Sequence, residues 1–481
     1  MPGTATATTP RTIGHLIGGR ERPGSADTLP VHDPATGEVI ARVPLGGAAE
    51  VEAAAAVARE AFPGWAATPL KERVQVFFRY RSLLDAHRRE LAALITAEHG
   101  KIGPEAEAEI DKAMELCEFA VSLPQLATGE VLEVSRGIEC RLEHHPLGVV
   151  TSIAPFNFPV MVPHWTIPNA IALGNTMVFK PSERVPLSTM RAAELLAEAG
   201  LPAGVFNVVH GSRGAVEALC DHPAIEAVSF VGSTPTAQAV YRRATANLKR
   251  ALALGGAKNH LFVLPDAEPE LTAGTVLASA IGCTGQRCMA ASVMVAIQET
   301  DPIIARLCDL ARQMVPGRDY GPAISAAARD RITGYIDEAV AEGAELLVDG
   351  RGLTVPGREG GFWIGPTVLD RVGPGMRIAR EEVFGPVLAI VRAGSLDEAM
   401  AVHHRSPYGN AAAIFTRSGA AARDVMRRAS AGMIGVNVGV PVPREPFPFG
   451  GWNASKFGVG DITGKSSIGF WTRDKKTTVR W

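Results

Sequence analysis

Apolar residues recur at the spacing of an α-helix through much of the first third of the chain. The pattern is clearest between Lys71 and His99, and Gly100 then predicts the end of that helix. Residues 49–62, which are dominated by Ala, Glu and Val, and residues 105–122 predict two further helices. We therefore expect the chain to begin with a mainly helical region.

Short apolar runs follow, and helical segments separate them. The first series contains strands predicted at Val149–Ala154, Thr176–Phe179, Val205–Val209 and Ala227–Val231, with a helix at Leu187–Ala199. The second series consists of His260–Leu264, Leu271–Ile281, Val293–Ile297, Ile303–Met314, Ile332–Glu342, Val387–Val391, Ala411–Phe415 and Ile434–Val438. Apolar strands that alternate with helices are typical of parallel sheets covered on both faces. The pattern predicts two α/β lobes that join near Gly255–Gly256.

Two segments fit neither lobe. Residues Val131–Arg141 and Ile468–Trp481 mix polar and apolar positions in a way that predicts extended chain. Because an exposed strand edge invites pairing, these segments could pair with each other or with another subunit. An ordinary surface hairpin is the alternative interpretation.

Composition narrows the class of protein. The chain has 481 residues, of which 46% are hydrophobic and 20% charged, so a large core can form and disorder is excluded as the main state. Lys and Arg (48) nearly balance Asp and Glu (50), so we expect no nucleic-acid partner. The chain has no run of 18 apolar residues and its start does not resemble a signal peptide, so we expect no membrane association. Six cysteines in so long a chain favour a reducing, cytoplasmic compartment.

Cys288 is the candidate nucleophile. It lies in the segment GCTGQRCM, after small residues and beside Arg287. A neighbouring cation lowers the pKa of a thiol, and the thiolate is the reactive form. A buried structural cysteine is the alternative, and we favour that interpretation for the five other cysteines. Because Cys283 and Cys288 lack C-x-x-C spacing and no His pair accompanies them, we expect no metal site.

Polar residues follow two of the predicted strands. Asn157 lies between Pro155 and Pro159, which stiffen the turn, so its amide is well placed to donate to an oxyanion. It could instead satisfy its own turn. Lys180 and Glu183 follow the next strand and could bind the two hydroxyls of a nucleotide ribose, or form a surface ion pair.

Gly232-Ser233-Thr234 ends a further predicted strand before a helix. Small hydroxyl residues at a helix N-terminus suit phosphate binding as well as ordinary capping. No G-x-G-x-x-G follows a predicted strand, so the usual dinucleotide fingerprint is absent. These motifs alone indicate no more than a possible nucleotide-dependent enzyme.

Taken in order, the motifs resemble those of the aldehyde dehydrogenase superfamily over almost the whole chain. The segments that carry the resemblance are APFNFP, FKPSE, GLPAGVFNVVHG, FVGST, LGGAKNH, GQRCM and EEVFGPV. The family implies an α/β fold with two doubly wound lobes, one that binds NAD and one that is catalytic, plus a β-arm for oligomerisation. The resemblance assigns the NAD-binding lobe to residues 1–130 and 148–254, the catalytic lobe to 255–438, the arm to 131–147 and 466–481, and a loop that shapes the substrate mouth to 439–465.

The resemblance also implies roles for single residues. Cys288 would attack an aldehyde carbonyl and later carry a thioester, and the Asn157 side chain with the Cys288 N–H would hold the oxyanion. Lys180 and Glu183 would bind the adenosine ribose. Glu183 would repel a 2′-phosphate and so favours NAD over NADP, although Arg184 lies beside it. The other positions implied at the cofactor are Ala154, Phe156, Ser233, Gly255, Glu382 and Phe384.

The chain departs from the hydrolytic members of the family at Ala253. Those members usually carry Glu at this position, before Leu-Gly-Gly, and the Glu activates water. Loss of a general base costs roughly 10²–10⁴-fold in that step. LGGAKNH, together with FNVVHG, GQRCM and FPFGGW, is similar to the methylmalonate-semialdehyde dehydrogenase subfamily, in which coenzyme A takes the acyl group and the β-carboxylate leaves as CO₂. A thiolate needs less help than water, so the missing base is tolerable.

Cations near the nucleophile recognise the substrate in that subfamily. Arg287 is retained. Lys112 stands where a second arginine is expected, and it keeps the positive charge but lacks the planar guanidinium group. Arg444 and His164 could add contacts at the substrate mouth. Each of Lys112, His164 and Arg444 could instead be solvated. Together these residues suggest an anionic aldehyde.

Two functions stay open from the sequence. The first is NAD-dependent, CoA-acylating oxidation of malonate or methylmalonate semialdehyde. The second is non-acylating oxidation of another anionic aldehyde, such as succinate semialdehyde or phosphonoacetaldehyde. A catalytically silent homologue is disfavoured because Cys288, Asn157, Lys180, Glu183 and Glu382 are all present. The resemblance also implies a homo-oligomer, either a dimer or a tetramer.

Overall fold

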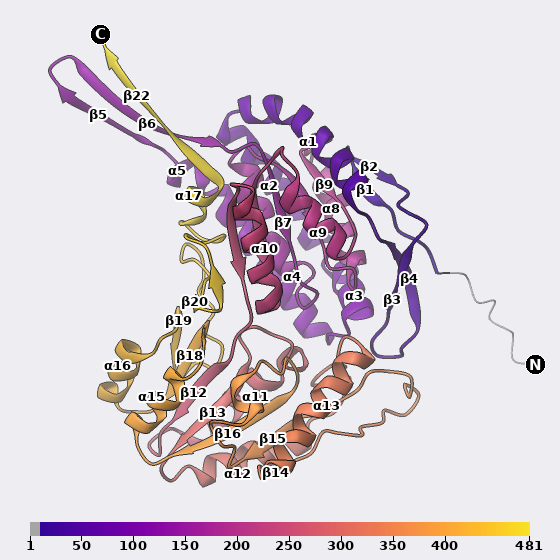
Figure 1. The fold of residues 1–481 in the computed structure, drawn as a ribbon, viewed down its shortest axis with the longest axis vertical. Helices are drawn as coiled ribbons and strands as arrows, with labels where there is room; N and C mark the ends of the chain where they lie inside the picture. The colour runs from indigo at the N-terminus through magenta and orange to yellow at the C-terminus, as the bar shows by residue number, and fades with distance from the viewer. Residues whose placement is uncertain (1–9) are drawn as a thin grey trace, which may run out of the picture.

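The first of two large sheets has eight strands in the order β2-β1-β9-β8-β7-β10-β11-β21 in the computed structural model, which describes residues 10–481 (Figure 1). Its strands are β1 (His15–Ile17), β2 (Arg20–Arg22), β7 (Val149–Ile153), β8 (Thr176–Lys180), β9 (Phe206–Val208), β10 (Ile225–Val231), β11 (Arg250–Leu254) and β21 (Lys456–Phe457). The five strands from β9 to β11 run parallel. Their carboxyl ends therefore meet at one edge of the sheet.

Helices cover both faces of the first sheet. They are α1 (Ala48–Ala67), α2 (Leu70–Ala86), α3 (Arg88–His99), α4 (Gly103–Val121), α5 (Leu123–Leu126), α6 (Met161–His164), α7 (Ile167–Ala172), α8 (Pro186–Glu198), α9 (Arg213–Asp221) and α10 (Thr234–Ala246). On β7, Val149 and Ile153 lie in the apolar cluster with α1, α9 and α10. Val150, between them, lies in the cluster with α2, α4 and α8. This period of two is the geometry of a strand that is buried on both faces.

The second sheet has seven strands in the order β14-β15-β16-β13-β12-β18-β19. Its strands are β12 (Asn259–Val263), β13 (Ala291–Ile297), β14 (Glu345–Val348), β15 (Thr367–Asp370), β16 (Val387–Ala393), β18 (Ala411–Phe415) and β19 (Met433–Val436). The accompanying helices are α11 (Pro269–Ile281), η1 (Gly282–Gly285), α12 (Asp301–Gln313), α13 (Ala326–Ala341), α14 (Arg377–Arg380), α15 (Leu396–His404) and α16 (Gly419–Arg428). All neighbouring strands are parallel except β14, which runs antiparallel to β15.

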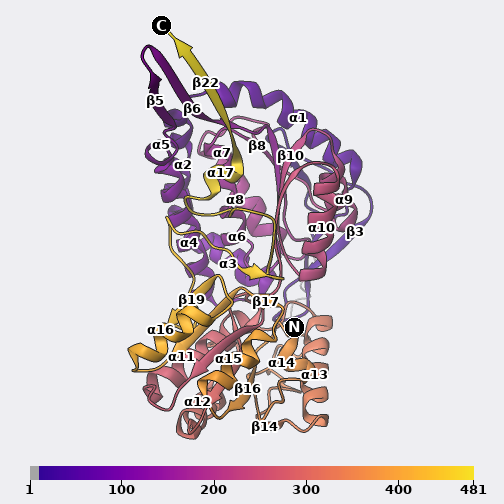
Figure 2. The same cartoon turned by 60° about the vertical axis from the view of Figure 1, so that its left-hand side comes forward.

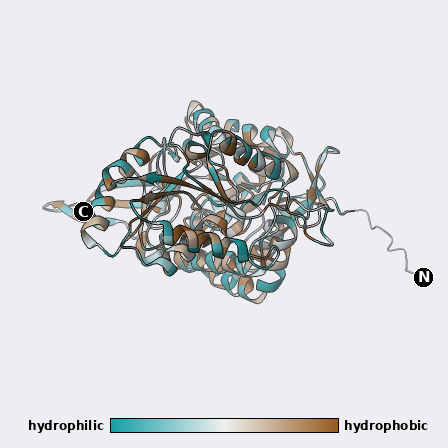
Figure 3. Cartoon of the chain, turned by 90° about the horizontal axis from the view of Figure 1, so that it is seen from below, coloured by the Kyte–Doolittle hydropathy of each residue, from teal (hydrophilic) through white to brown (hydrophobic). Residues whose placement is uncertain are grey.

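The predicted α/β fold with parallel sheets is confirmed. In Figure 3 strands in the middle of the molecule are mostly hydrophobic in colour, and the helices around them carry both hydrophobic and hydrophilic colour. No helix within residues 10–481 has both the length and the apolar character needed to cross a membrane.

Strands β5 (Glu130–Ser135), β6 (Ile138–Pro146) and β22 (Thr472–Arg480) form an antiparallel arm that projects from the first lobe (Figure 2). Strand β6 lies in the middle and pairs with both neighbours. The two segments expected to be extended therefore pair with each other. The expectation is wrong at Ser467–Trp471, which form helix α17, because Ile468, Phe470 and Trp471 are buried against the first lobe.

Other expectations need correction as well. Residues 71–99 form two helices rather than one, because the chain turns at His87 between α2 and α3. The apolar spacing continues across this break since both helices pack on the same core. The beginning of the chain contains strands, including the hairpin of β3 (Thr28–His32) and β4 (Val39–Pro44). These strands are short and mixed in polarity, and β1 pairs with β9 at Leu16 and Val208, so local patterning did not reveal them.

Residues 439–465 cross between the two sheets a second time. Strand β20 (Trp452–Asn453) pairs with β17 (Tyr408–Gly409), and β21 then pairs antiparallel with β11. The main-chain N–H of Gly255 donates to the carbonyl of Ser455 at 2.9 Å. The returning segment therefore lies against the chain that first crosses from one sheet to the other.

Neighbouring phenylalanines on α2 test the packing of the first lobe. Phe77 is 0% exposed and Phe78 is 50% exposed. Phe77→Ala should lower the free energy of unfolding by about 3–5 kcal/mol because it opens a cavity. Phe78→Ala should change it by less than about 0.5 kcal/mol, as surface substitutions usually do. Thermal unfolding of both variants measures the difference, and equal shifts would contradict the orientation of α2.

Candidate active site

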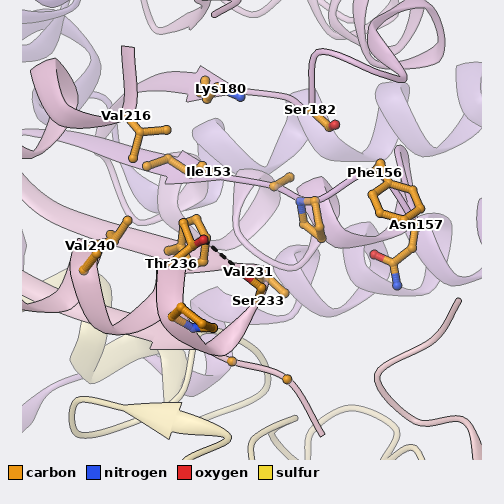
Figure 4. Close-up of a pocket in the computed structure, with 18 of the residues that line it drawn as sticks. Ile153, Phe156, Asn157, Lys180, Ser182, Val216, Val231, Ser233, Thr236 and Val240 are labelled. Atoms are coloured by element: carbon orange, nitrogen blue, oxygen red, sulfur yellow. Dashed lines mark hydrogen bonds between the residues drawn. The ribbon is translucent and has the colours of Figure 1, made fainter. Parts of the chain in front are cut away.

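A cavity of about 1340 Å³ opens at the carboxyl edge of the first sheet. Figure 4 shows side chains at or after the ends of β7, β8 and β10 around this space, among them Asn157, Lys180 and Ser233. The cavity is lined by every predicted catalytic and cofactor residue: Cys288, Asn157, Ala154, Phe156, Lys180, Glu183, Arg184, Ser233, Gly255, Glu382 and Phe384. The carboxyl edge of a parallel sheet is where ligands usually bind in such folds.

Buried Lys180 and partly exposed Glu183 form an ion pair at the end of β8. The Lys180 ammonium lies 3.1 Å from the Glu183 carboxylate and donates to the Pro181 carbonyl at 2.9 Å. Burial lowers the pKa of Lys180, and the charge of Glu183 opposes that shift. Burial also opposes ionisation of Glu183, but Lys180 and its other contacts hold the pKa of this carboxyl below its ordinary value. The pair thus offers a donor and an ionised acceptor to the cavity.

Two glycines form the chain that leaves β11. A Cβ on Gly255 would lie 2.9 Å from the carbonyl oxygen of Ala454, and one on Gly256 would collide with the Glu382 carboxylate. The N–H of Gly256 donates to the Thr234 hydroxyl at 2.8 Å, next to Ser233 at the start of α10. The close approach of the Ala454 carbonyl therefore favours glycine at 255, whereas a side chain at 256 would displace the Glu382 carboxylate.

Glu382 and Phe384 border the cavity from the second lobe. The Glu382 carboxylate accepts from the N–H of Ala257 at 3.0 Å, and burial raises its pKa to about 7. The Phe384 ring meets the Phe156 ring edge-on, with centroids 5.8 Å apart. Lys258 was missed from the sequence; burial lowers its pKa to about 7, and the nearby Glu382 opposes this. The motif LGGAKNH shows that a lysine is present at this position, but its burial cannot be read from the sequence.

Asparagines fix the main chain around the candidate nucleophile. The carbonyl of Cys288 accepts from the side-chain amides of Asn259 at 2.8 Å and Asn410 at 2.9 Å. The Asn157 amide donates to the carbonyl of Gln286 at 2.9 Å. Asn259 lies in a motif noted in the sequence, whereas nothing near Asn410 marks it. The turn with Asn157 is therefore tied to the loop that carries Cys288.

The Cys288 thiol is not acidified in this structure. Burial raises its pKa to about 12, and the Glu382 charge acts in the same direction, while Arg287 opposes both. The expectation that a neighbouring cation gives this thiol a lowered pKa is therefore wrong, because desolvation outweighs one cation. Within residues 10–481 there is also no group of three or more His, Cys, Asp or Glu arranged to hold a metal ion.

Arg287 does not line the large cavity, although it lies beside Cys288. Its guanidinium donates to the carbonyls of Ala278 at 2.7 Å and Ser279 at 3.0 Å. Its Nε is buried and has no hydrogen-bond partner in the part of the chain that the structure describes. Arg287 thus retains a donor that its own loop does not satisfy.

The other three residues expected near the substrate are also outside the lining of this cavity. The Lys112 ammonium lies 2.6 Å from the Glu445 carboxylate, and Arg444 lies 2.8 Å from Glu115. The buried His164 donates to the Val160 carbonyl at 2.6 Å and accepts from the Tyr80 hydroxyl at 2.9 Å. Burial lowers its pKa to about 4, so the ring is neutral near pH 7. The structure does not bring Lys112, His164 and Arg444 together with Cys288.

The fold and the cavity define an aldehyde dehydrogenase: the model of the aldehyde dehydrogenase family matches residues 22–477, and the chain belongs to this family. Over 479 residues it is 45% identical to malonate-semialdehyde dehydrogenase of Pseudomonas aeruginosa, covering 98% of this chain and 96% of that protein. The structure of methylmalonate-semialdehyde dehydrogenase from Oceanimonas doudoroffii is similar with a TM-score of 0.97, 44% identity and 98% coverage of each chain. A Sinorhizobium meliloti protein assigned the same activity, solved with NAD, gives a TM-score of 0.97 and 43% identity over 98% of this chain and 99% of that one. The family inferred from the motifs is confirmed.

Alkylation of Cys288 tests the electrostatics of the cavity. With Glu382→Gln, iodoacetamide should react about 3–10-fold faster above pH 7, because removal of a nearby negative charge lowers the thiol pKa by roughly 0.5–1 unit. Below pH 7 the two proteins should converge, since Glu382 itself has a pKa of about 7 and is then neutral. Glu381→Gln is the matched control, because Glu381 pairs outward with Arg377 and Tyr335. Equal rates for wild type and Glu382→Gln at pH 9 would refute the assignment.

Proposed function

We propose that this chain catalyses the NAD-dependent oxidation of malonate or methylmalonate semialdehyde and passes the acyl group from Cys288 to coenzyme A. The observation that carries the proposal is the single cavity in which Cys288 and Asn157 lie with the residues that follow the parallel strands. The names of similar proteins, malonate-semialdehyde and methylmalonate-semialdehyde dehydrogenase, support the class of substrate.

The residues of the cavity fit NAD. Lys180 and Glu183 offer a donor and an acceptor for the hydroxyls of the adenosine ribose, and Glu382 offers an acceptor for the second ribose. The ionised Glu183 would repel a 2′-phosphate, which supports NAD over NADP. The similar Sinorhizobium meliloti structure was solved with NAD. When bound, NAD supplies the hydride acceptor.

The remaining chemistry belongs to the chain and its substrates. The Cys288 thiolate adds to the aldehyde carbonyl and forms a thiohemiacetal, and the Asn157 amide with the Cys288 N–H stabilises the oxyanion. Loss of hydride from the same carbon leaves a thioester on Cys288. The thiolate of coenzyme A then attacks the thioester carbonyl, and the Cys288 sulfur leaves. A β-carboxylate on the acyl group leaves as CO₂, and the electron pair of the broken C–C bond forms an enolate of the thioester, which then takes up a proton at the α-carbon.

Ala253 supports coenzyme A as the acyl acceptor. It is 1% exposed, packs in the apolar cluster with α10, and offers no proton acceptor for water. Water is the acceptor in a second candidate function, the hydrolytic oxidation of an anionic aldehyde such as succinate semialdehyde or phosphonoacetaldehyde. Glu382 favours this alternative, because it lines the cavity with Cys288 and its pKa of about 7 suits a general base near neutral pH.

NADH absorbance with a panel of aldehydes distinguishes the two functions. The panel contains malonate, methylmalonate and succinate semialdehydes, phosphonoacetaldehyde and propanal, each with and without coenzyme A. Without coenzyme A we expect a burst of NADH equal to the enzyme concentration, and with coenzyme A we expect sustained turnover. The reason is that only the thiol of coenzyme A removes the acyl group from Cys288. Cys288→Ala should abolish both. Sustained turnover without coenzyme A would refute acyl transfer to a thiol. Loss of that turnover in Glu382→Gln, with the burst retained, would then identify Glu382 as the base and not only as a ligand of NAD.

We propose further that Arg287 recognises the carboxylate of the substrate. Its buried Nε has no partner in residues 10–481, and a buried donor of this kind usually finds one. Lys112 and Arg444 are already paired with Glu445 and Glu115, and His164 is neutral inside the lobe. These contacts support smaller roles in substrate recognition for Lys112, Arg444 and His164 than for Arg287.

Arg287→Met tests this recognition. We expect kcat/KM for malonate semialdehyde to fall by about 10–100-fold, the loss expected for a hydrogen bond to a charged group, while propanal is little affected. Lys112→Met is the matched control and should change the ratio of the two aldehydes less, because Glu445 already neutralises that cation. Equal losses for both aldehydes would show that Arg287 acts on the shape of the loop instead.

The arm supports a homo-oligomer, a dimer or tetramer, as the working form. Strand β5 is exposed along its length and presents Val131 and Leu132, which are 65% and 66% exposed. Composition favours the cytoplasm as the location of this protein.

We assign NAD binding to residues 1–130 and 148–254, catalysis to 255–438, oligomerisation to 131–147 and 466–481, and the substrate mouth to 439–465.

A further inference from the structure

A buried lysine holds the turn that carries Asn157. Lys101 lies between α3 and α4, and its ammonium donates to the main-chain carbonyl of Asn157 at 2.6 Å. It also pairs with the Glu109 carboxylate at 2.5 Å and lies 3.9 Å from the centroid of the Phe158 ring. The side chains of Lys101 and Glu109 are both 0% exposed. Because burial of two charges is costly, such a pair contributes little to stability compared with apolar residues, and its presence calls for another role.

Glu109 extends the same contact along the turn. Its second carboxylate oxygen accepts from the main-chain N–H groups of Val160 at 2.7 Å and Met161 at 2.9 Å. The Lys101–Glu109 pair therefore holds the turn at Asn157 on one side and at residues 160–161 on the other. Three hydrogen bonds from buried, charged side chains therefore reach this backbone and leave it little freedom.

Helix α4 also holds the loop of the candidate nucleophile. Glu105, one turn before Glu109, accepts from the main-chain N–H of Cys283 at 2.6 Å. Cys283 and Thr284 have φ values of 51° and 56°, in the left-handed region that such residues seldom adopt. Because carboxylates four residues apart lie on one face of a helix, α4 contacts both the turn of Asn157 and the loop that leads to Cys288.

We infer that Lys101, supported by Glu109, is a positioning residue that fixes the Asn157 amide relative to the Cys288 sulfur. The inference rests on the proposed function, in which that amide stabilises an oxyanion on the substrate. Such a donor stabilises the transition state only if it is already oriented, and displacement by about 1 Å can lower a rate about 100-fold. Lys101 itself does not contact the substrate.

The test is a double-mutant cycle between the buried pair and Asn157. Lys101→Met with Glu109→Gln removes both charges and the bond to the Asn157 carbonyl, while the glutamine can still accept from residues 160–161. We expect kcat for the aldehyde to fall about 10–100-fold, with the KM for NAD within about twofold of wild type. Asn157→Ala alone should lower kcat by about 10²–10³-fold. In the doubly substituted background it should lower kcat clearly less, because a misplaced amide already contributes little to transition-state stabilisation. The rate of Cys288 alkylation should stay within about twofold, since the thiol is not moved.

A second, partly buried ion pair provides the control. Arg392 and Asp370 are 2.7 Å apart in the second sheet and line no part of the cavity. Arg392→Met with Asp370→Asn should leave kcat within about twofold and the full effect of Asn157→Ala intact. If Asn157→Ala costs the same factor with and without the Lys101–Glu109 pair, the pair is structural only and the inference is refuted. Lys101→Gln replaces the double variant, under the same criterion, if the latter does not fold. Absence of aldehyde-dependent NADH formation in the wild type would overturn the proposed function instead.

Discussion

The parallel hydrogen bonding of β9, β8, β7, β10 and β11 is the constraint on which the site depends. Each strand ends at the same edge, so residues that are far apart in sequence, such as Asn157, Lys180 and Ser233, converge without any direct contact being needed to gather them. The nucleophile comes from the second lobe, through the short η1 segment with its left-handed residues. The relative position of the two lobes thus decides whether the parts of the site meet.

The site keeps its charged groups in a desolvated environment. Burial brings the pKa values of both Glu382 and Lys258 to about 7 and raises that of the Cys288 thiol to about 12. A thiol with a pKa of about 12 is mostly protonated at neutral pH. Formation of the thiolate requires a change in the surroundings of the sulfur, which binding of ligands in the cavity can provide.

The sequence predicted the parts of this protein that local chemistry determines. Strand and helix periodicity predicted the two α/β series, and local motifs predicted Cys288, Asn157 and Lys180 as candidate site residues. The resemblance to the aldehyde dehydrogenase superfamily predicted Glu382, which also lines the cavity. Properties that arise from long-range packing were inaccessible: the burial of Lys258, the support of Cys288 by Asn410, and the pairing of Lys112 with Glu445. The thiol pKa was predicted in the wrong direction for the same reason, since the adjacent Arg287 is visible in the sequence and desolvation is not.

Strand β21 closes the edge of the first sheet only after the chain has passed through the whole second sheet. The first lobe is therefore discontinuous, and a fragment that stops near residue 254 would expose the backbone N–H and C=O groups of β11. Such an open, apolar edge invites pairing between chains and aggregation. During synthesis the sheet of the first lobe can be completed only after about 200 further residues have been made. The pairing of β11 with β21 is thus a contact of high sequence separation, and such contacts slow folding. The route of the chain thus makes folding of the first lobe depend on synthesis of the second, even though each lobe has its own core.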